Sequence, residues 1–203
     1  MALLKSFARN ISTAASIQTL TNDTKQDSDA ISRITINEYL DTLERMMLIE
    51  NQHAWNTSIR LSAELRKTPK RHFADPSMAV SILGLDKEAL LNDPNYLGFL
   101  FESLVVHDLR VYAQDCAAQV YHYRDSKNDE IEPLIQNRAE NWAAFEIKLG
   151  SNAFDVAAEN LIKITITKNI SKKPQSLNII TGTGLTYIRH DGVNVISISS
   201  LGI

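Results

Sequence analysis

The 203-residue chain is poor in cysteine and has no long hydrophobic run. Its single cysteine, Cys116, excludes an internal disulfide, and its apolar helical setting predicts a small buried residue rather than a nucleophile. No apolar stretch approaches the roughly 20 residues that a membrane-spanning helix needs. The start of the chain carries Lys5 and Arg9 but no hydrophobic signal region. We therefore expect a cytoplasmic protein that does not associate with membranes.

The chain also lacks a strong charge of either sign and the phosphate-binding loop of ATPases. Its formal net charge is −3, so overall electrostatics does not indicate nucleic-acid binding, although local basic patches can still provide it. No Gly-x-x-x-x-Gly-Lys-Ser/Thr sequence is present to cradle nucleotide phosphates. Gly182-Thr183-Gly184 lacks the following lysine and predicts a turn. The chain is therefore not expected to hydrolyse ATP by itself.

Residues 1–75 are predicted to form a winged-helix module. Helical patterns occur from Leu4 to Ile11, from Ile17 to Asn22, and after Ser32, which fits the N-cap position. Extended, turn-rich sequence follows from Leu48 to Leu65. The third helix has the clearest apolar stripe, with residues at three- and four-residue steps: Ile36, Tyr39, Leu40, Leu43, Met46 and Met47.

Two interpretations of this module stay open. The acidic third helix favours a helical adaptor that contacts another protein, whereas Arg33 and Asn37 are its candidates for contacts with DNA. The basic run from residue 66 to residue 72 predicts a solvated surface strand or, alternatively, an edge that contacts phosphates. In the second case Lys67, Lys70 and Arg71 would bind nucleic acid.

Residues 76–203 are predicted to form an α/β (α+β) domain. After a short helical segment, the strongest helical pattern runs from Leu97 to Gln114, and Pro133 indicates that the second of the following strands lies at an edge or is bulged. The buried stripe of the long helix is predicted to comprise Leu97, Phe101, Leu104, Val105, Leu109 and Tyr112. The following elements are three strands (Gln119–Arg124, Glu130–Gln136, Trp142–Leu149), a helix (Phe154–Ile164), a strand (Leu177–Thr181) and a hairpin around Asp191-Gly192.

Three glutamates and one lysine in residues 76–203 are candidates for a catalytic site. Glu102 has apolar residues three and four positions away on its helix, so its carboxylate needs a partner. Period-two alternation places Glu146 and Lys148 on one face of their strand, and Glu132 lies on the preceding strand. A glutamate-bearing helix, an acidic strand and a Glu-x-Lys strand are the arrangement of metal-dependent phosphodiesterases.

In such a site carboxylate oxygens hold a hard cation such as Mg²⁺, which polarises the phosphate and lowers the pKa of a bound water. The sequence therefore predicts Glu132 and Glu146 as Mg²⁺ ligands, Glu102 as an auxiliary ligand and Lys148 as the catalytic cation. The alternative is that Glu146 and Lys148 form only a half-exposed ion pair, which implies no chemistry.

Several segments resemble one family, the C-terminal region of prokaryotic AAA-type ATPases, which is a domain of unknown function (4143). The stretch from Asn92 to Val106 is similar to its Gly-x-x-Phe-Glu-x-x-Val helix. Tyr121–Asp125, Glu130–Glu132 and Phe145–Gly150 resemble its later motifs, and Ser32–Glu50 resembles its winged-helix part. The resemblance covers nearly the whole chain.

The resemblance implies a winged helix followed by a restriction-endonuclease-like mixed sheet flanked by helices, as in PD-(D/E)xK nucleases. Glu102, Glu132, Glu146 and Lys148 fall on the motif positions. The family usually has aspartate where this chain has Glu132, followed here by Pro133, and a longer carboxylate beside a rigid proline can displace a metal.

Two functions follow as hypotheses. The first is a nuclease-like, nucleic-acid-associated domain of an AAA-type ATPase that hydrolyses phosphodiesters with Mg²⁺. The second is a catalytically inactive module that binds DNA or protein and regulates a separate ATPase subunit or domain. Replacement of the usual aspartate and the nearly neutral charge favour the second, whereas the arrangement of the four site residues favours the first.

Overall fold

The computed structural model describes residues 1–27, 31–55, 68–125, 129–167 and 172–202. Its contacts divide the chain into two compact units. The first unit combines Met1–Gln52 with Thr68–Leu104, and the second unit combines His53–Lys67 with Val105–Ile203. The predicted boundary after residue 75 stays a prediction, because contacts in the folded chain do not show which parts fold independently.

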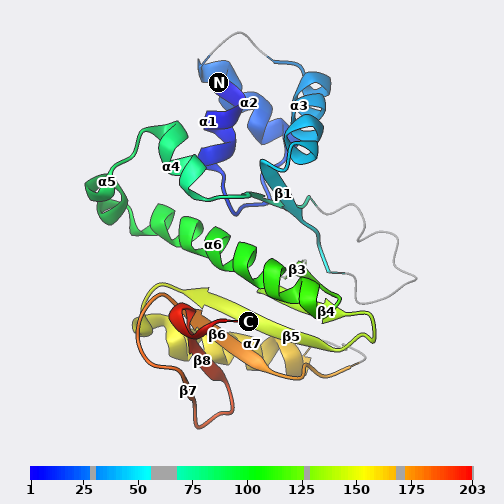
Figure 1. The fold of residues 1–203 in the computed structure, drawn as a ribbon, viewed down its shortest axis with the longest axis vertical. Coiled ribbons are helices and arrows are strands. Elements are labelled where there is room, and N and C mark those ends of the chain that lie inside the picture. The colour runs from blue at the N-terminus through cyan, green and yellow to red at the C-terminus, as the bar shows by residue number, and fades with distance from the viewer. Residues whose placement is uncertain (28–30, 56–67, 126–128, 168–171, 203) are drawn as a thin grey trace. The chain divides into compact units, whose positions relative to one another are not determined.

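The first unit contains helices and a two-stranded sheet (Figure 1). The strands pair antiparallel, with Glu50 opposite His72. Three helices followed by a strand pair agree with the predicted order, whereas the winged-helix fold itself stays a prediction. The elements are α1 (Ala2–Arg9), α2 (Ile17–Asp27), α3 (Arg33–Arg45), β1 (Ile49–Gln52), β2 (Lys70–Phe73), α4 (Ser77–Leu83), α5 (Lys87–Asn92) and the first part of α6 (Pro94–Asp115).

Helix α3 begins where the sequence predicts. The side chain of Ser32 accepts a hydrogen bond from the backbone N–H of Thr35, which confirms the N-cap. Ile36 and Leu40 then face inward and are buried. They join a core that draws on α1, α2, both strands, α4 and α6: Leu3, Phe7, Ala8, Ile11, Leu20, Ile36, Leu40, Ile49, Phe73, Ala79 and Leu100.

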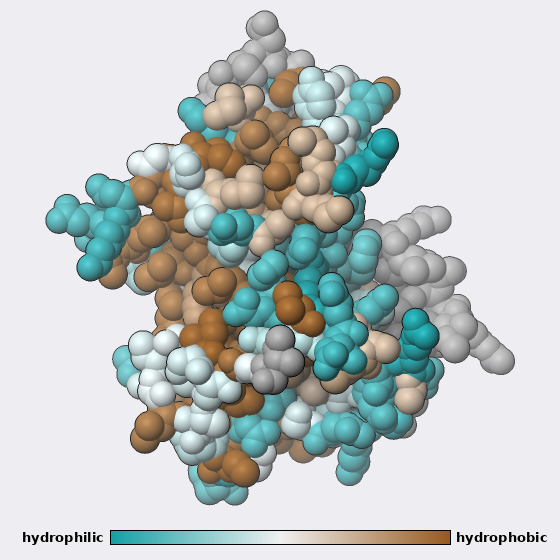
Figure 2. Space-filling model, in the orientation of Figure 1, coloured by the Kyte–Doolittle hydropathy of each residue, from teal (hydrophilic) through white to brown (hydrophobic). Residues whose placement is uncertain are grey.

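The predicted apolar stripe of α3 is wrong at three of its positions. Tyr39, Met46 and Met47 are 50%, 62% and 80% exposed. Because the helix ends at Arg45, its periodicity no longer positions the two methionines. Hydrophobic residues also reach the surface at several places on the face shown in Figure 2.

Strand β2 also differs from the prediction. The solvated strand predicted for residues 66–72 is wrong for its described end, because Lys70 and His72 are buried. The His72 ring lies in a polar network, with Nδ1 3.2 Å from Ser103 Oγ and Nε2 3.1 Å from Gln52 Oε1. Buried polar groups need such partners, and here they join β1, β2 and α6 within the first unit.

Helix α6 is the long helix that the sequence predicts, but its buried face is shifted. Val105 and Leu109 are buried as predicted, whereas Leu104 is 40% exposed. Most of the buried residues of α6 recur at steps of three and four and lie on one face of the helix. The buried residues are Leu100, Ser103, Val105, Val106, Leu109 and Ala113. No helix among the described residues, α6 included, is long and apolar enough to cross a membrane.

The second unit contains a mixed sheet with the strand order β3-β4-β5-β6-β8-β7 (Figure 1). β3, β4 and β5 form an antiparallel meander, and β5, β6 and β8 are parallel neighbours. The predicted order of helix, three strands, helix, strand and hairpin is confirmed. Its elements after α6 are β3 (Ala118–Arg124), β4 (Glu130–Asn137), β5 (Trp142–Lys148), α7 (Phe154–Thr167), β6 (Leu177–Thr181), β7 (Tyr187–Ile188) and β8 (Asn194–Ser197), with short 3₁₀ turns at Ser151–Ala153 and Ile198–Ser200.

Pro133 lies in an inner strand, so of the two predicted alternatives, an edge position or a bulge, the structure shows the bulge. β4 lies between β3 and β5, and its pairing with β3 shifts between Tyr121 and Tyr123. Pairing with β5 skips from Glu132 to Leu134. Because proline has no N–H to donate, a local irregularity lets it occupy an inner strand.

Helix α7 connects β5 to β6 and packs on both strands. Its inward residues meet one face of the sheet, to which β5 contributes Trp142 and Ala144. Trp55 joins this core, and its indole ring packs against Trp142 with ring centroids 4.7 Å apart. The buried members are Trp55, Tyr123, Ile131, Leu134, Trp142, Ala144, Phe154, Ala157, Ala158, Leu161, Ile164, Ile179, Val193 and Val195.

Candidate functional site

Glu132 and Glu146 lie directly opposite each other on neighbouring strands. β4 and β5 are antiparallel, and the two glutamates are partners in their register. Side chains directly opposite in such a pair lie on the same sheet face, with Cβ atoms about 5 Å apart. Two like charges in this position are destabilising unless a cation lies beside them. The pair is therefore a place that favours positive charge.

Lys148 supplies part of that charge. Its Nζ lies 2.8 Å from Glu146 Oε2, and the side chains of Lys148 and Glu146 are 35% and 14% exposed. Their shared face, predicted from the period-two alternation, is thus confirmed. The ion pair that was predicted as the alternative also forms, so the geometry is compatible with both interpretations.

The same face of the sheet continues from the core to these charged residues. Trp142 and Ala144 pack against α7, and alternation along β5 places Glu146 and Lys148 next on this side. On this face of β5 the charged residues therefore follow directly after the residues that pack in the apolar core. This explains how a rigid strand holds an acid and a lysine at the rim of a packed core.

Glu102 has different partners. It belongs to the first unit, where its Oε1 accepts hydrogen bonds from Lys70 Nζ at 2.8 Å and from Ser12 Oγ at 2.7 Å. The side chains of Lys70 and Glu102 are 11% and 19% exposed. The expectation that this carboxylate needs a partner is confirmed, and sequence reasoning missed which residues supply it. Glu102 as a metal ligand stays a prediction.

The donor set for a metal is therefore small. Across residues 1–27, 31–55, 68–125, 129–167 and 172–202, no three or more His, Cys, Asp or Glu side chains gather in a group that could hold a metal ion. Glu132 and Glu146 offer two carboxylates. Mg²⁺ keeps several water ligands and is often held by only one or two carboxylates together with substrate phosphates, so this pair fits that mode of binding.

The residues predicted to bind nucleic acid fall into two groups. Arg33 and Asn37 are exposed on α3, where they can reach a ligand. Lys70 is bound to Glu102, and Arg71 donates from Nη1 to the carbonyl oxygen of Ala15 at 2.7 Å. Burial lowers the pKa of the Arg71 guanidinium, and the Glu44 carboxylate acts in the opposite direction.

Lys70 and Arg71 thus serve contacts within the first unit, and a role in phosphate binding stays a prediction. Lys67 lies outside the described residues.

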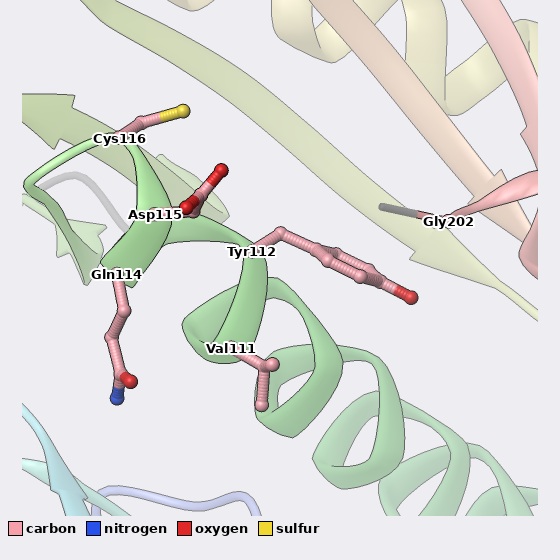
Figure 3. Close-up of a pocket in the computed structure, with 6 residues that line it drawn as sticks. All are labelled: Val111, Tyr112, Gln114, Asp115, Cys116 and Gly202. Atoms are coloured by element: carbon pink, nitrogen blue, oxygen red, sulfur yellow. The ribbon is translucent and has the colours of Figure 1, made fainter.

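Cys116 lies beside a surface hollow and is exposed, so its predicted burial is wrong. Because α6 ends at Asp115, Cys116 lies in the following turn and not on the helical stripe. The hollow, of about 650 Å³, is lined by Val111, Tyr112, Gln114, Asp115, Cys116 and Gly202. In Figure 3 the Tyr112 ring extends toward Gly202.

Arg189 forms an ionic network that the sequence analysis missed. Its guanidinium donates to Asp191 through Nε and Nη2 and lies 2.8 Å from Asp155 at the start of α7. The hydrogen bond from Arg189 lowers the pKa of the Asp191 carboxyl, and these contacts raise the pKa of Arg189. A spacing of two residues across a hairpin turn is a weak sequence signal, and Asp155 is remote in sequence.

This network predicts a pH dependence of stability. Because the pKa of Asp191 is lowered in the folded state, its carboxylate stabilises the fold above its ordinary pKa of 3.8, and this contribution disappears as the pH falls through the lower folded value. The free energy of unfolding would be measured by urea denaturation over a series of pH values. We expect Asp191→Asn to be less stable than the unmodified chain at pH 6 and equally stable at the lowest pH of the series. A constant difference at every pH would exclude the Asp191 charge as its cause.

Comparison with known families agrees with the C-terminal resemblance. Residues 97–201 match the domain of unknown function DUF4143, and residues 1–89 match the domain of unknown function DUF8612. The chain belongs to the family of DUF4143 proteins. Nothing among curated proteins or solved structures matches it.

Proposed function

We propose that the second unit is a nuclease-like, nucleic-acid-associated domain that hydrolyses phosphodiesters with Mg²⁺. The observation that carries this proposal is the direct opposition of Glu132 and Glu146, with Lys148 bound to one of them. Two facing carboxylates disfavour each other unless a cation lies between or beside them. Two facing carboxylates are also a donor set that a divalent cation can bind, and Lys148 Nζ lies 2.8 Å from one of them.

Glu132 and Glu146 would hold the Mg²⁺ ion, which when bound supplies a polarised phosphate and a more acidic water. Lys148 lies on the same face and would bind the phosphate oxygens, so that its ammonium group offsets the negative charge that develops there. The rigid strands would keep these groups at fixed spacing. Their positions on the second and third strands of the meander agree with a restriction-endonuclease-like fold.

The wider context also belongs to this proposal. The DUF4143 match agrees with the motifs that resemble the C-terminal region of AAA-type ATPases. From this resemblance we propose that the chain works in the cytoplasm beside a separate ATPase subunit or domain. The first unit, with three helices and a strand pair, would be its winged-helix part.

The test of the proposal is cleavage of DNA by the purified full chain. Single-stranded and double-stranded DNA would be incubated with rising Mg²⁺ or Mn²⁺, with EDTA as the blank. We expect products that appear only with the divalent cation. No cleavage of either substrate at millimolar cation would refute the chemistry.

A second candidate is a regulatory binding module without catalysis. The observation that favours it is the engagement of Glu102 by Lys70 and Ser12 inside the first unit. The Glu102 carboxylate already has Lys70 as its cationic partner. To act as an auxiliary metal ligand, Glu102 would have to give up this ion pair. If the full chain bound a purified AAA-type ATPase and bound no divalent cation, this second candidate would be favoured.

A further inference from the structure

We infer that the carboxyl ends of β5, β6 and β8 bind a backbone phosphate of a nucleic-acid strand. This inference rests on the proposed function for the identity of the ligand. Lys148, Thr181 and Ser197 end the three parallel strands and are neighbours in register across them. Ligands of open α/β sheets bind outside the carboxyl ends of parallel strands, where the connecting loops gather.

The three residues form one row on one sheet face. Lys148 pairs with Thr181, and Thr181 pairs with Ser197, so alternation gives all three the same side. The preceding row contains Glu146, followed by two apolar residues of the core, Ile179 and Val195. On this face the polar residues therefore gather at the carboxyl ends of the strands, and they include a lysine next to the proposed cation site.

The hydroxyl groups of Thr181 and Ser197 each form a hydrogen bond with the loop that follows their strand. Thr181 is 1% exposed and donates from Oγ1 to the carbonyl oxygen of Thr183 at 3.2 Å. Ser197 is 4% exposed, and its Oγ lies 2.9 Å from Ser199 Oγ. Thr183 and Ser199 are exposed beyond the strand ends, so their own hydroxyl groups reach solvent there. Exposed hydroxyl groups on loops that hydrogen bonds fix in place are suitable donors to phosphate oxygens.

The backbone at this end is also open to a ligand. A side-chain carbon added at Gly150, which follows β5, or at Gly184, which follows β6, would meet no atom within 4 Å among the described residues other than its chain neighbours. Gly184 has φ +104°, a conformation that glycine adopts readily and other residues rarely do. The space on the Cβ side of these two glycines is therefore open to a ligand.

Charge specifies the ligand class. Lys148 is one third exposed and shares its charge with Glu146. A divalent cation held by Glu132 and Glu146 would take over that carboxylate and leave the ammonium group for a phosphate. Lys148 would then lie between the phosphate at the cation and a neighbouring phosphate, which the exposed hydroxyl groups of Thr183 and Ser199 would bind.

The test compares two charge insertions at opposite ends of β6. Thr183→Glu adds a negative charge beyond the carboxyl end, and Gln175→Glu adds the same charge at an exposed position before the amino end. Binding of a fluorescein-labelled DNA duplex to the full chain would be followed by anisotropy in Ca²⁺, with the DNA checked for integrity afterwards. We expect Thr183→Glu to weaken binding about tenfold and Gln175→Glu to change it by less than about twofold.

Equal effects of the two insertions would overturn the inference. Ser199→Glu provides a second insertion at the carboxyl ends if Thr183→Glu does not fold. Inorganic phosphate tested as competitor separates the two sources of the ligand: competition at micromolar concentration would overturn a nucleic-acid ligand in favour of free phosphate, and competition only at millimolar concentration supports it.

The outcome is separable from that of the proposed function. Mg²⁺-dependent cleavage with equal binding of both variants would remove the phosphate site and keep the chemistry. If Thr183→Glu alone lost DNA binding and the unmodified chain did not cleave DNA, the phosphate site would stand and the proposed hydrolysis would be refuted.

Discussion

Glu146→Gln is expected to lower Mg²⁺-dependent DNA cleavage by about 100-fold or more. Glutamine has nearly the same shape as glutamate but no charge, so the strand pairing with Glu132 should persist while one of two carboxylate ligands is lost. Lys148 would also lose its counter-ion at 2.8 Å. Initial cleavage rates at saturating Mg²⁺ measure the effect.

The matched control for this variant is Glu159→Gln on the exposed side of α7, which removes one negative charge from the same unit without touching the pair. Its rate should stay within about twofold of the unmodified rate. Far-ultraviolet circular dichroism checks that both variants fold. Unchanged cleavage in Glu146→Gln would refute the assigned role, as it would in Lys148→Met.

Lys70→Met is expected to lower the free energy of unfolding of the first unit by about 3 kcal/mol. Methionine fills similar space but removes the ammonium partner of the Glu102 carboxylate, which keeps its hydrogen bond from Ser12. Both members of the ion pair are largely buried in the unmodified chain. A buried charge without its counter-ion is strongly destabilising, whereas a neutral pair of similar volume is not.

The two units allow separate readouts in urea unfolding. Both tryptophans, Trp55 and Trp142, lie in the second unit, so their fluorescence follows that unit, and far-ultraviolet circular dichroism also follows the helices of the first. We expect the dichroism transition of Lys70→Met to shift more than the fluorescence transition. The double variant Lys70→Met with Glu102→Gln should recover part of the loss, because the uncompensated charge is gone.

Lys87→Met is the control for removal of a lysine, because Lys87 is exposed on α5. Its free energy of unfolding should stay within about 0.5 kcal/mol of the unmodified value. A loss in Lys70→Met as small as in Lys87→Met would show that the ion pair with Glu102 does not stabilise the first unit.

Much of the second unit could be predicted because its pattern is local. Alternation from Trp142 to Lys148 fixed both the strand and the face shared by Glu146 and Lys148. The hairpin around Asp191-Gly192 was also predictable, since Gly192 adopts the positive φ that such a turn needs. Local spacing therefore gave half of the candidate site.

The contacts of Glu102 could not be predicted in the same way. Its partner Lys70 lies 32 residues away and Ser12 lies 90 residues away, and no period in the sequence connects them. The basic run around Lys70 gave the opposite signal, because clusters of basic residues are usually solvated. Burial of a lysine depends on a counter-ion from another element, and only the three-dimensional structure supplies that information.

Register between strands was the second limit. The sequence placed Glu132 and Glu146 on adjacent strands, but a shift by one residue would turn one of them to the other face. The irregularity beside Pro133 made this register hard to foresee, because the pairing of β4 with β3 shifts by one residue there, whereas its pairing with β5 keeps one register. Their direct opposition is therefore a finding of the structure, and it carries the proposed function.

Isothermal titration calorimetry of Mn²⁺ into the full chain tests the central claim most directly. We expect saturable binding of one cation that is lost in Glu132→Gln and in Glu146→Gln and retained in Glu159→Gln. Absence of binding at millimolar Mn²⁺, or binding that survives neutralisation of both facing glutamates, would contradict it.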